Sequence, residues 1–178
     1  MKDWEMPVVV PPPVAIRPAT IADLGAVVEV LWSVGAEGQW IGIEVPFERE
    51  ARRRSLEDML ARDSAALFVA DAADGALGDA VIGYIGVAVA SYGVADIAMA
   101  LLDGWRGRGL GTALLDAGLG WARGAGAHKA ALEVWPHNQP ALELYARVGF
   151  VEEGRKRRHY RRADGALWDA ILMGLPLS

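Results

Sequence analysis

The sequence predicts an α/β fold in which a central mixed, mostly antiparallel sheet is flanked by about four helices. Strand-like segments rich in Val, Ile and Ala occupy the middle of the chain, amphipathic helical patterns lie on both sides of them, and strand-like segments return at the end. At 178 residues the chain is long enough for one hydrophobic core, so we expect a single domain over residues 14–178. Residues 1–13, which end in consecutive prolines, are expected to form a flexible leader.

The first part of the chain is expected to form a strand and two helices. Residues 14–18 form a short apolar stretch, and Thr20 with Asp23 resembles a helix-capping pair at the start of a helix with one apolar face. A second helix is expected over residues 49–61. The segment 38–42 has mixed character and is expected to be a loop between the two helices.

The rest of the chain alternates strands and helices. An antiparallel meander is expected over 66–70, 81–90 and 94–102. Apolar residues then recur at helical spacing from Leu110 until Gly124 and Gly126 break the pattern. The remaining elements are expected to be a strand at 130–135, a short helix at 140–148 and closing strands at 150–154 and 168–173.

The composition argues against several classes of protein. The chain has no cysteine, which excludes disulfides, thiolate zinc sites and acyl-cysteine intermediates, and a cytoplasmic location is expected. No apolar run reaches the roughly 18 residues that span a bilayer, so we expect no membrane contact. The net charge of -5 argues against nucleic acid as a partner, whereas 7 tryptophans would permit a homodimer surface.

The segment 105–112, Trp-Arg-Gly-Arg-Gly-Leu-Gly-Thr, is the strongest chemical feature. It lies between an expected strand and an expected helix, where glycines and free N–H groups favour a pyrophosphate, and Arg106 and Arg108 add positive charge. A tight turn with two solvated arginines would give the same pattern. The segment lacks the lysine of a nucleotide P-loop and follows a meander, which argues against an NTPase and a dinucleotide enzyme.

Two motifs resemble the GNAT N-acetyltransferases. Arg106, Gly109 and Gly111 match the coenzyme loop Arg/Gln-x-x-Gly-x-Gly/Ala, and residues 132–150 match the second motif of the family in type and spacing. The resemblance covers roughly residues 16–175 and implies the GNAT fold, acetyl-CoA as cosubstrate and no metal. The implied coenzyme contacts are Met99, Ala100, Leu101, Arg106, Gly107, Arg108, Gly109, Leu110, Gly111, Thr112, Asn138 and Tyr145.

The resemblance also implies three catalytic residues. Tyr145 would lie near the thioester sulfur and give a proton to the departing thiolate. Glu133 and Asp96 compete as the base that deprotonates the amine; Glu133 is favoured because Asp96 stands where many family members carry the longer Glu. If the family resemblance is set aside, Tyr145 is interpreted as a core aromatic residue and Asn138 as a helix cap. Each of the two carboxylates is then interpreted as solvated or paired with an arginine.

The sequence therefore predicts an enzyme that transfers acetyl from acetyl-CoA to a primary amine by direct attack on the thioester. The acceptor is expected to be a small-molecule amine or a peptide N-terminus, with Gln39, Trp40 and Glu44 as candidates for the acceptor pocket. The alternative is a non-catalytic acyl-CoA-binding sensor on the same fold. The basic run Arg155 to Arg162 is interpreted as a solvated strand and turn, with contact to the coenzyme 3′-phosphate or the substrate as the alternative.

Overall fold

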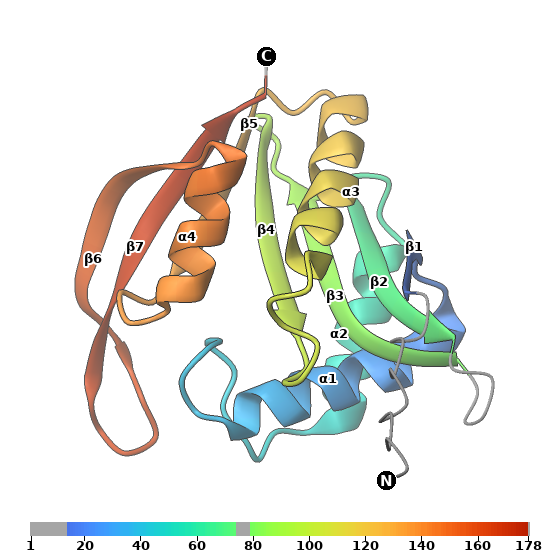
Figure 1. The fold of residues 1–178 in the computed structure, drawn as a ribbon, viewed down its shortest axis with the longest axis horizontal. Helices are drawn as coiled ribbons and strands as arrows, with labels where there is room; N and C mark the ends of the chain where they lie inside the picture. Colours follow the sequence, from blue (N-terminus) through green and yellow to red (C-terminus); the bar gives the residue numbers. More distant parts are fainter. Residues whose placement is uncertain (1–13, 74–78, 178) are drawn as a thin grey trace, which may run out of the picture.

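The computed structural model describes residues 14–73 and 79–177 (Figure 1). The predicted leader, residues 1–13, lies outside the described residues. The elements in chain order are β1 (Val14–Pro18), the 3₁₀ helix η1 (Ile21–Asp23), α1 (Leu24–Ala36), α2 (Arg49–Leu60), β2 (Ala65–Ala73), β3 (Asp79–Val89), β4 (Val94–Leu101), α3 (Leu110–Gly124), β5 (Lys129–Val134), α4 (Gln139–Val148), β6 (Val151–Arg161) and β7 (Leu167–Pro176). None of the described helices is long and apolar enough to cross a membrane.

The strands form one 7-stranded sheet in the order β1-β2-β3-β4-β5-β7-β6. Neighbouring strands are antiparallel except β4 and β5, which are parallel. This mixed, mostly antiparallel sheet with its flanking helices confirms the predicted fold class.

The sheet opens between β4 and β5. Their backbone pairing joins Val94–Asp96 to Lys129–Ala131 and, in the described residues, goes no further. Figure 1 shows the two strands separating beyond this point. The second half of β4 still pairs with β3 on its other side, so the edge that faces the opening presents backbone N–H and C=O groups to it.

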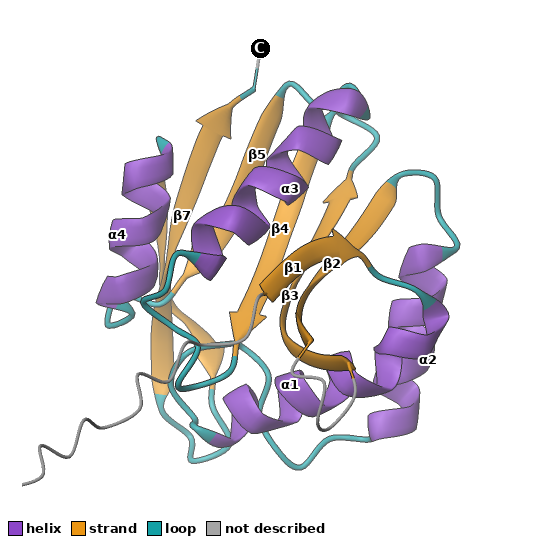
Figure 2. Ribbon diagram, turned by 45° about the vertical axis from the view of Figure 1, so that its right-hand side comes forward, coloured by secondary structure: helices purple, strands orange, loops and turns teal. Residues whose placement is uncertain are grey.

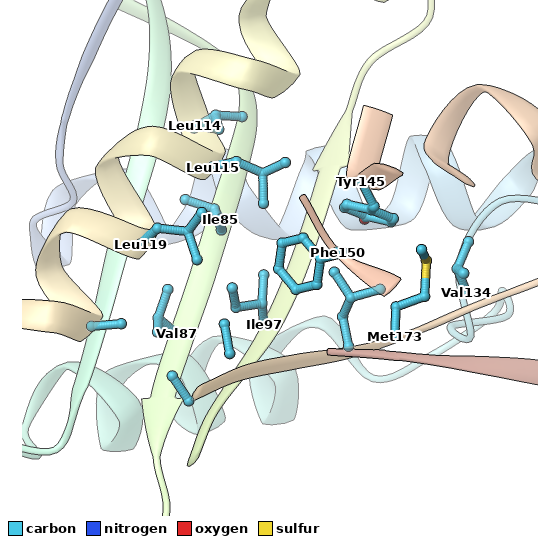
Figure 3. Close-up of a cluster of buried hydrophobic side chains, with 14 of the residues drawn as sticks. Ile85, Val87, Ile97, Leu114, Leu115, Leu119, Val134, Tyr145, Phe150 and Met173 are labelled. Atoms are coloured by element: carbon cyan, nitrogen blue, oxygen red, sulfur yellow. The ribbon is translucent and has the colours of Figure 1, made fainter. Parts of the chain in front are cut away.

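Each face of the sheet has its own core, and Figure 2 shows α3 and α4 over one face with α1 and α2 over the other. On the first face, Leu114 and Leu115 of α3 are fully buried against strand residues such as Ile85 (Figure 3). On the second face, Leu24 and Val27 of α1 are fully buried in a separate cluster. Burying one such side chain contributes about 1.5–3 kcal/mol, so the two clusters hold the helices to the sheet.

A glycine sets the distance between α3 and the sheet. A Cβ atom on Gly118 would lie 2.9 Å from Ile85 Cδ1 and 3.0 Å from Val87 Cγ2. Real Cβ atoms almost never approach so closely, so any side chain at this position would push α3 away from β3. The first turn of α3 follows the predicted phosphate loop, so this contact also fixes where that loop lies.

The start of the first helix is tied to the sheet by ion pairs. Arg17 on β1 lies 2.7 Å from Asp23 in η1 and 2.7 Å from Asp71 on β2. The carboxylate of Asp23 also accepts hydrogen bonds from the Thr20 N–H and hydroxyl, which is the predicted capping pair. Hydrogen bonding to Arg17 lowers the pKa of Asp23 well below its usual value, so this carboxylate stays ionised.

The predicted end of the penultimate strand at Gly154 is wrong, because β6 continues to Arg161. Most of the basic run therefore lies in an edge strand. β6 contains a bulge: Lys156 pairs with Ala170 and Tyr160 with Trp168, so four steps along β6 correspond to two along β7. Runs of charged residues are depleted in strands, which is why the pattern of residue types indicated an earlier end.

Candidate active site

A cavity of about 1170 Å³ lies where β4 and β5 separate. Ten of the predicted coenzyme contacts line it, whereas Arg108 and Leu110 do not. These ten are Met99, Ala100, Leu101, Arg106, Gly107, Gly109, Gly111, Thr112, Asn138 and Tyr145. The two candidate bases, Asp96 and Glu133, also line it, so the structure brings the predicted site together in one place.

The loop between β4 and α3 has the backbone shape that glycines allow. Gly107 has φ +73° and Gly109, the N-cap of α3, has φ +81°. Both values lie in the left-handed region, which residues with a Cβ adopt at a cost of about 1–2 kcal/mol. The first backbone N–H groups of α3 follow directly and have no partner within the helix, so they can bind an anion.

Gly111 serves the packing of the two helices beside the cavity. A Cβ atom there would lie 2.8 Å from Cδ2 of Leu144 on α4. The absence of a side chain lets α4 approach the first turn of α3. Gly111 therefore helps to place Tyr145, the neighbour of Leu144, at the cavity.

Arg106 points toward the loop that follows α1. Its guanidinium lies 2.5 Å from Glu37, and its Nε donates to the carbonyl oxygen of Leu101 at 3.0 Å. Glu37 also accepts a hydrogen bond from the indole of Trp40. Hydrogen bonding to Arg106 is the main cause of the lowered pKa of Glu37, so the pair stays charged. The predicted coenzyme loop and the predicted acceptor loop are thus joined by an ion pair.

Asn138 is the N-cap of α4. Its side-chain oxygen accepts from the N–H of Ala141 at 3.3 Å, and its side-chain nitrogen donates to the carbonyl oxygen of Trp40 at 3.4 Å. The residue both starts the helix that carries Tyr145 and holds the loop around Trp40. The two predicted interpretations of Asn138, helix cap and cavity residue, are therefore compatible.

Tyr145 lies in the last turns of α4 and is only 8% exposed. Its ring packs edge-on against Phe150, with centroids 5.8 Å apart (Figure 3). Burial, with a smaller effect of Tyr84, raises the pKa of Tyr145 to about 12. The phenol therefore stays protonated at physiological pH and can donate a hydrogen bond into the cavity.

Asp96 and Glu133 lie on the same face of the sheet. Alternate residues of a strand face opposite sides. Ala95 and Ile97 on one strand, like Leu132 on the other, belong to the core under α3 and α4, so the two carboxylates face the side that carries α1 and α2. Within the described residues, the carboxylate of Asp96 makes no hydrogen bond or ion pair.

Glu133 is held by two side chains from β6. Lys156 Nζ donates to Glu133 Oε1 at 2.5 Å, and the Tyr160 hydroxyl donates to Oε2 at 2.5 Å. Burial alone would raise the pKa of Glu133, but the hydrogen bonds from Lys156 and Tyr160 outweigh it, and the pKa lies below its usual value. Glu133 is therefore ionised in the folded protein and has a fixed orientation.

The sequence did not assign a role to Lys156 or Tyr160. Both reach the same carboxylate because the bulge in β6 brings them opposite β7 residues that are only two apart, or about 7 Å. The signal available in the sequence was their even spacing within a strand, which places both on one face. That signal was hidden because the strand was expected to end before them.

The loop after α1 is fixed to the β6–β7 hairpin by Arg162. This side chain is 5% exposed, lies 3.4 Å from Glu44 through its Nε and donates from Nη1 to the carbonyl oxygen of Gly42 at 3.2 Å. Its guanidinium lies 4.4 Å from the ring centroid of Trp168 and 5.8 Å from that of Trp135. A buried cation between two aromatic rings is a strong constraint on the loop that it contacts.

The comparison with known families agrees with this geometry. The Acetyltransferase (GNAT) family profile matches residues 34–150. This match covers most of the chain, and the protein belongs to the GNAT acetyltransferase family. The predicted family membership is confirmed.

Two curated relatives are N-alpha-acetyltransferases. The protein from Sulfurisphaera tokodaii is 40% identical over 82 residues, which are 46% of this chain and 47% of the relative. The N-alpha-acetyltransferase RimI of Mycobacterium tuberculosis is 46% identical over 57 residues, which are 32% of this chain and 34% of the relative. The matches therefore span about half of the first relative and a third of the second.

A solved structure shows the same fold with the coenzyme present. The phosphinothricin acetyltransferase of Sinorhizobium meliloti in complex with acetyl-CoA aligns with a TM-score of 0.81 at 22% identity. The alignment covers 93% of this chain and 89% of that chain. This likeness establishes the fold of the present chain.

Proposed function

We propose that the protein transfers an acetyl group from acetyl-CoA to a primary amine, on a small molecule or a peptide N-terminus. The observation that carries this proposal is one continuous cavity that is lined by the glycine loop, the open edge of β4, Tyr145 and Glu133. An anion site, a buried acid and an ionised carboxylate are the groups that direct acyl transfer to an amine requires. The curated N-alpha-acetyltransferases support it.

The residues present fit acetyl-CoA as a substrate. The α3 N-terminus and the loop before it offer N–H groups to the pyrophosphate. The edge of β4 that faces away from β3 offers backbone groups to the pantetheine arm over Met99, Ala100 and Leu101, where the Leu101 carbonyl also accepts from Arg106. Side-chain identity on β4 matters little for such backbone contacts. Acetyl-CoA supplies the thioester carbonyl that the amine attacks.

Glu133 is the proposed base. An amine is mostly protonated near neutral pH and must lose a proton to attack. The lowered pKa of Glu133 keeps its carboxylate charged, so it can attract the incoming ammonium. The same shift makes it a weaker proton acceptor, so we assign it the removal of the ammonium proton through water. Asp96 lines the same cavity on the same face and is the second candidate.

Tyr145 is the proposed acid. The raised pKa of its phenol keeps the proton on the oxygen, so the hydroxyl donates a hydrogen bond to the sulfur as negative charge develops there. A thiol has an ordinary pKa of about 8.5, so full proton transfer from a phenol of pKa about 12 to the thiolate is unfavourable. Stabilisation of the leaving thiolate is therefore the main contribution assigned to Tyr145.

A thiol-release assay with acetyl-CoA tests this function, with polyamines, amino acids, aralkylamines and short peptides as acceptors. We expect acceptor-dependent thiol release together with acetyl-CoA binding measured by calorimetry. Coenzyme binding without turnover on any amine would contradict the proposal and favour the acyl-CoA sensor.

A further inference from the structure

The cavity has two walls of different chemistry. The wall next to α3 and α4 contains the glycine loop and the proposed coenzyme contacts. The opposite wall comes from α1, the loop after it and the end of β5. Apart from the carboxylates of Asp96 and Glu133 on the same face of the sheet, its side chains are apolar or aromatic. Its main members are Leu31, Val34, Trp40, Ile41, Ile43 and Trp135. We call this opposite wall the acceptor wall.

Three cations next to the acceptor wall are already paired. The pairs are Arg106 with Glu37 at 2.5 Å, Lys156 with Glu133 at 2.5 Å and Arg162 with Glu44 at 3.4 Å. Arg147 also lines the cavity, but it lies on α4, on the coenzyme side. In the described part of the chain, no side chain that lines the acceptor wall therefore carries an unpaired positive charge.

This charge distribution separates two kinds of acceptor. A carboxylate beside the reacting amine would lose its hydration against the acceptor wall without gaining a cation, which is costly. An ammonium group, in contrast, meets two carboxylates that line the cavity, Glu133 and Asp96, and Asp96 has no ion-pair partner among the described residues. An apolar group next to the amine would be buried against side chains such as Ile41 and Trp40, which is favourable.

We infer that the acceptor carries its amine beside an apolar group and has no carboxylate next to that amine. Two sources supply this chemistry: a peptide whose first residue has a large apolar side chain, and a small aralkylamine. Free amino acids and amino-acid analogues such as phosphinothricin lack it, because they retain the carboxylate. The inference rests on the proposed function and narrows its substrate class.

Matched acceptors test the inference. We would compare 2-phenylethylamine, phenylalanine, phenylalanine amide and two tetrapeptide amides that differ only in a first residue of Phe or Asp. At equal concentrations of unprotonated amine, we expect kcat/KM for 2-phenylethylamine and for phenylalanine amide to exceed that for phenylalanine by about tenfold or more. The kcat/KM for the Phe peptide should exceed that for the Asp peptide. Comparison of the peptides with 2-phenylethylamine shows which of the two sources the protein uses.

A variant pair tests the wall itself. Ile41→Ala should raise KM for 2-phenylethylamine by about tenfold and leave the affinity for acetyl-CoA unchanged. The control is Ile21→Ala, the same change at a side chain that is 67% exposed and does not line the cavity. Thermal unfolding of both variants separates an effect on the wall from an effect on stability.

The outcomes distinguish the inference from the proposed function. If kcat/KM for phenylalanine equals that for 2-phenylethylamine, the inference is overturned and the proposed function stands. The same holds if Ile41→Ala leaves the KM for 2-phenylethylamine unchanged. If no amine is acetylated, the proposed function fails. Calorimetric titration of the coenzyme-bound protein with the two compounds then decides about the wall: tighter binding of 2-phenylethylamine supports the acceptor preference, and equal binding overturns it.

Discussion

The coenzyme side and the acceptor side of the cavity are built in different ways. The coenzyme side comes from two continuous segments, 99–112 and 138–145, and relies on backbone groups and glycine conformations. The acceptor side is assembled from side chains of α1, the loop after it, β5 and β6, which are far apart in sequence. One side is therefore a local property of the chain, and the other is a property of the folded molecule.

Two polar contacts connect the loops of the two sides. The ion pair between Arg106 and Glu37 joins the coenzyme loop to the acceptor loop, and Asn138 contacts the same loop at Trp40. This arrangement predicts that most substitutions affect coenzyme binding or acceptor binding, but not both. Kinetic constants for the two substrates can therefore be used to test the division.

The largest effect is expected for Tyr145→Phe, which removes the hydroxyl that is proposed to act on the thioester sulfur. Loss of the hydrogen bond to the developing thiolate should lower kcat by about 100- to 1000-fold, while both KM values stay within a small factor. Steady-state kinetics with both substrates measure kcat and the two KM values. The control is Tyr92→Phe, because Tyr92 is 70% exposed and outside the cavity. An unchanged kcat in Tyr145→Phe would remove Tyr145 from the chemistry.

A second large effect is expected for Glu133→Gln. The lowered pKa of Glu133 keeps the carboxylate ionised as the pH falls to about 5, so the wild-type protein keeps its base in this range. The Gln variant depends on amine that is already deprotonated in solution. Its kcat/KM should be about 10- to 100-fold lower near pH 6 and should approach the wild type as the pH rises toward the amine pKa.

The pH profile of kcat/KM for both proteins provides the measurement. Glu152→Gln is the matched control, since Glu152 is exposed on the edge strand β6 and does not line the cavity. Parallel profiles for the wild type and Glu133→Gln would exclude Glu133 as the base. Asp96→Asn would then be tested in the same way.

The coenzyme side could be predicted from the sequence because its signals are local. Glycines at fixed spacing between a strand and a helix define the loop, and Gly107 and Gly109 indeed adopt positive φ angles. The order of helices and strands could also be predicted, since hydrophobic periodicity and turn residues are local as well. These features do not depend on how the chain packs.

The acceptor side could not be predicted in the same way. The pairing of Glu133 with Lys156 and Tyr160 depends on a bulge in β6. The position of Glu44 depends on its ion pair with Arg162, which lies in the turn after β6. No local pattern encodes such contacts between segments that are more than 20 residues apart. A run of arginines was reasonably interpreted as solvated, although one of them is buried.

A smaller effect, restricted to the coenzyme side, is expected for Gly109→Ala. A Cβ atom would meet open space, but φ +81° costs a residue other than glycine about 1–2 kcal/mol. The dissociation constant for acetyl-CoA should rise about tenfold, with the acceptor KM unchanged. Gly120→Ala is the control, because this exposed helical glycine also faces open space and has no positive φ. A change in acceptor KM alone would contradict the division between the two sides.

The smallest effect, restricted to the acceptor side, is expected for Arg162→Gln. The variant loses the contacts to Glu44 and Gly42 that fix the loop after α1, and loss of one such interaction should raise the acceptor KM by about threefold. The acetyl-CoA dissociation constant should not change, because Arg162 does not line the cavity. Arg161→Gln, at an exposed neighbour, controls for the loss of charge. If both variants weaken acetyl-CoA binding equally, the hairpin acts through net charge and the division between the two sides does not hold there.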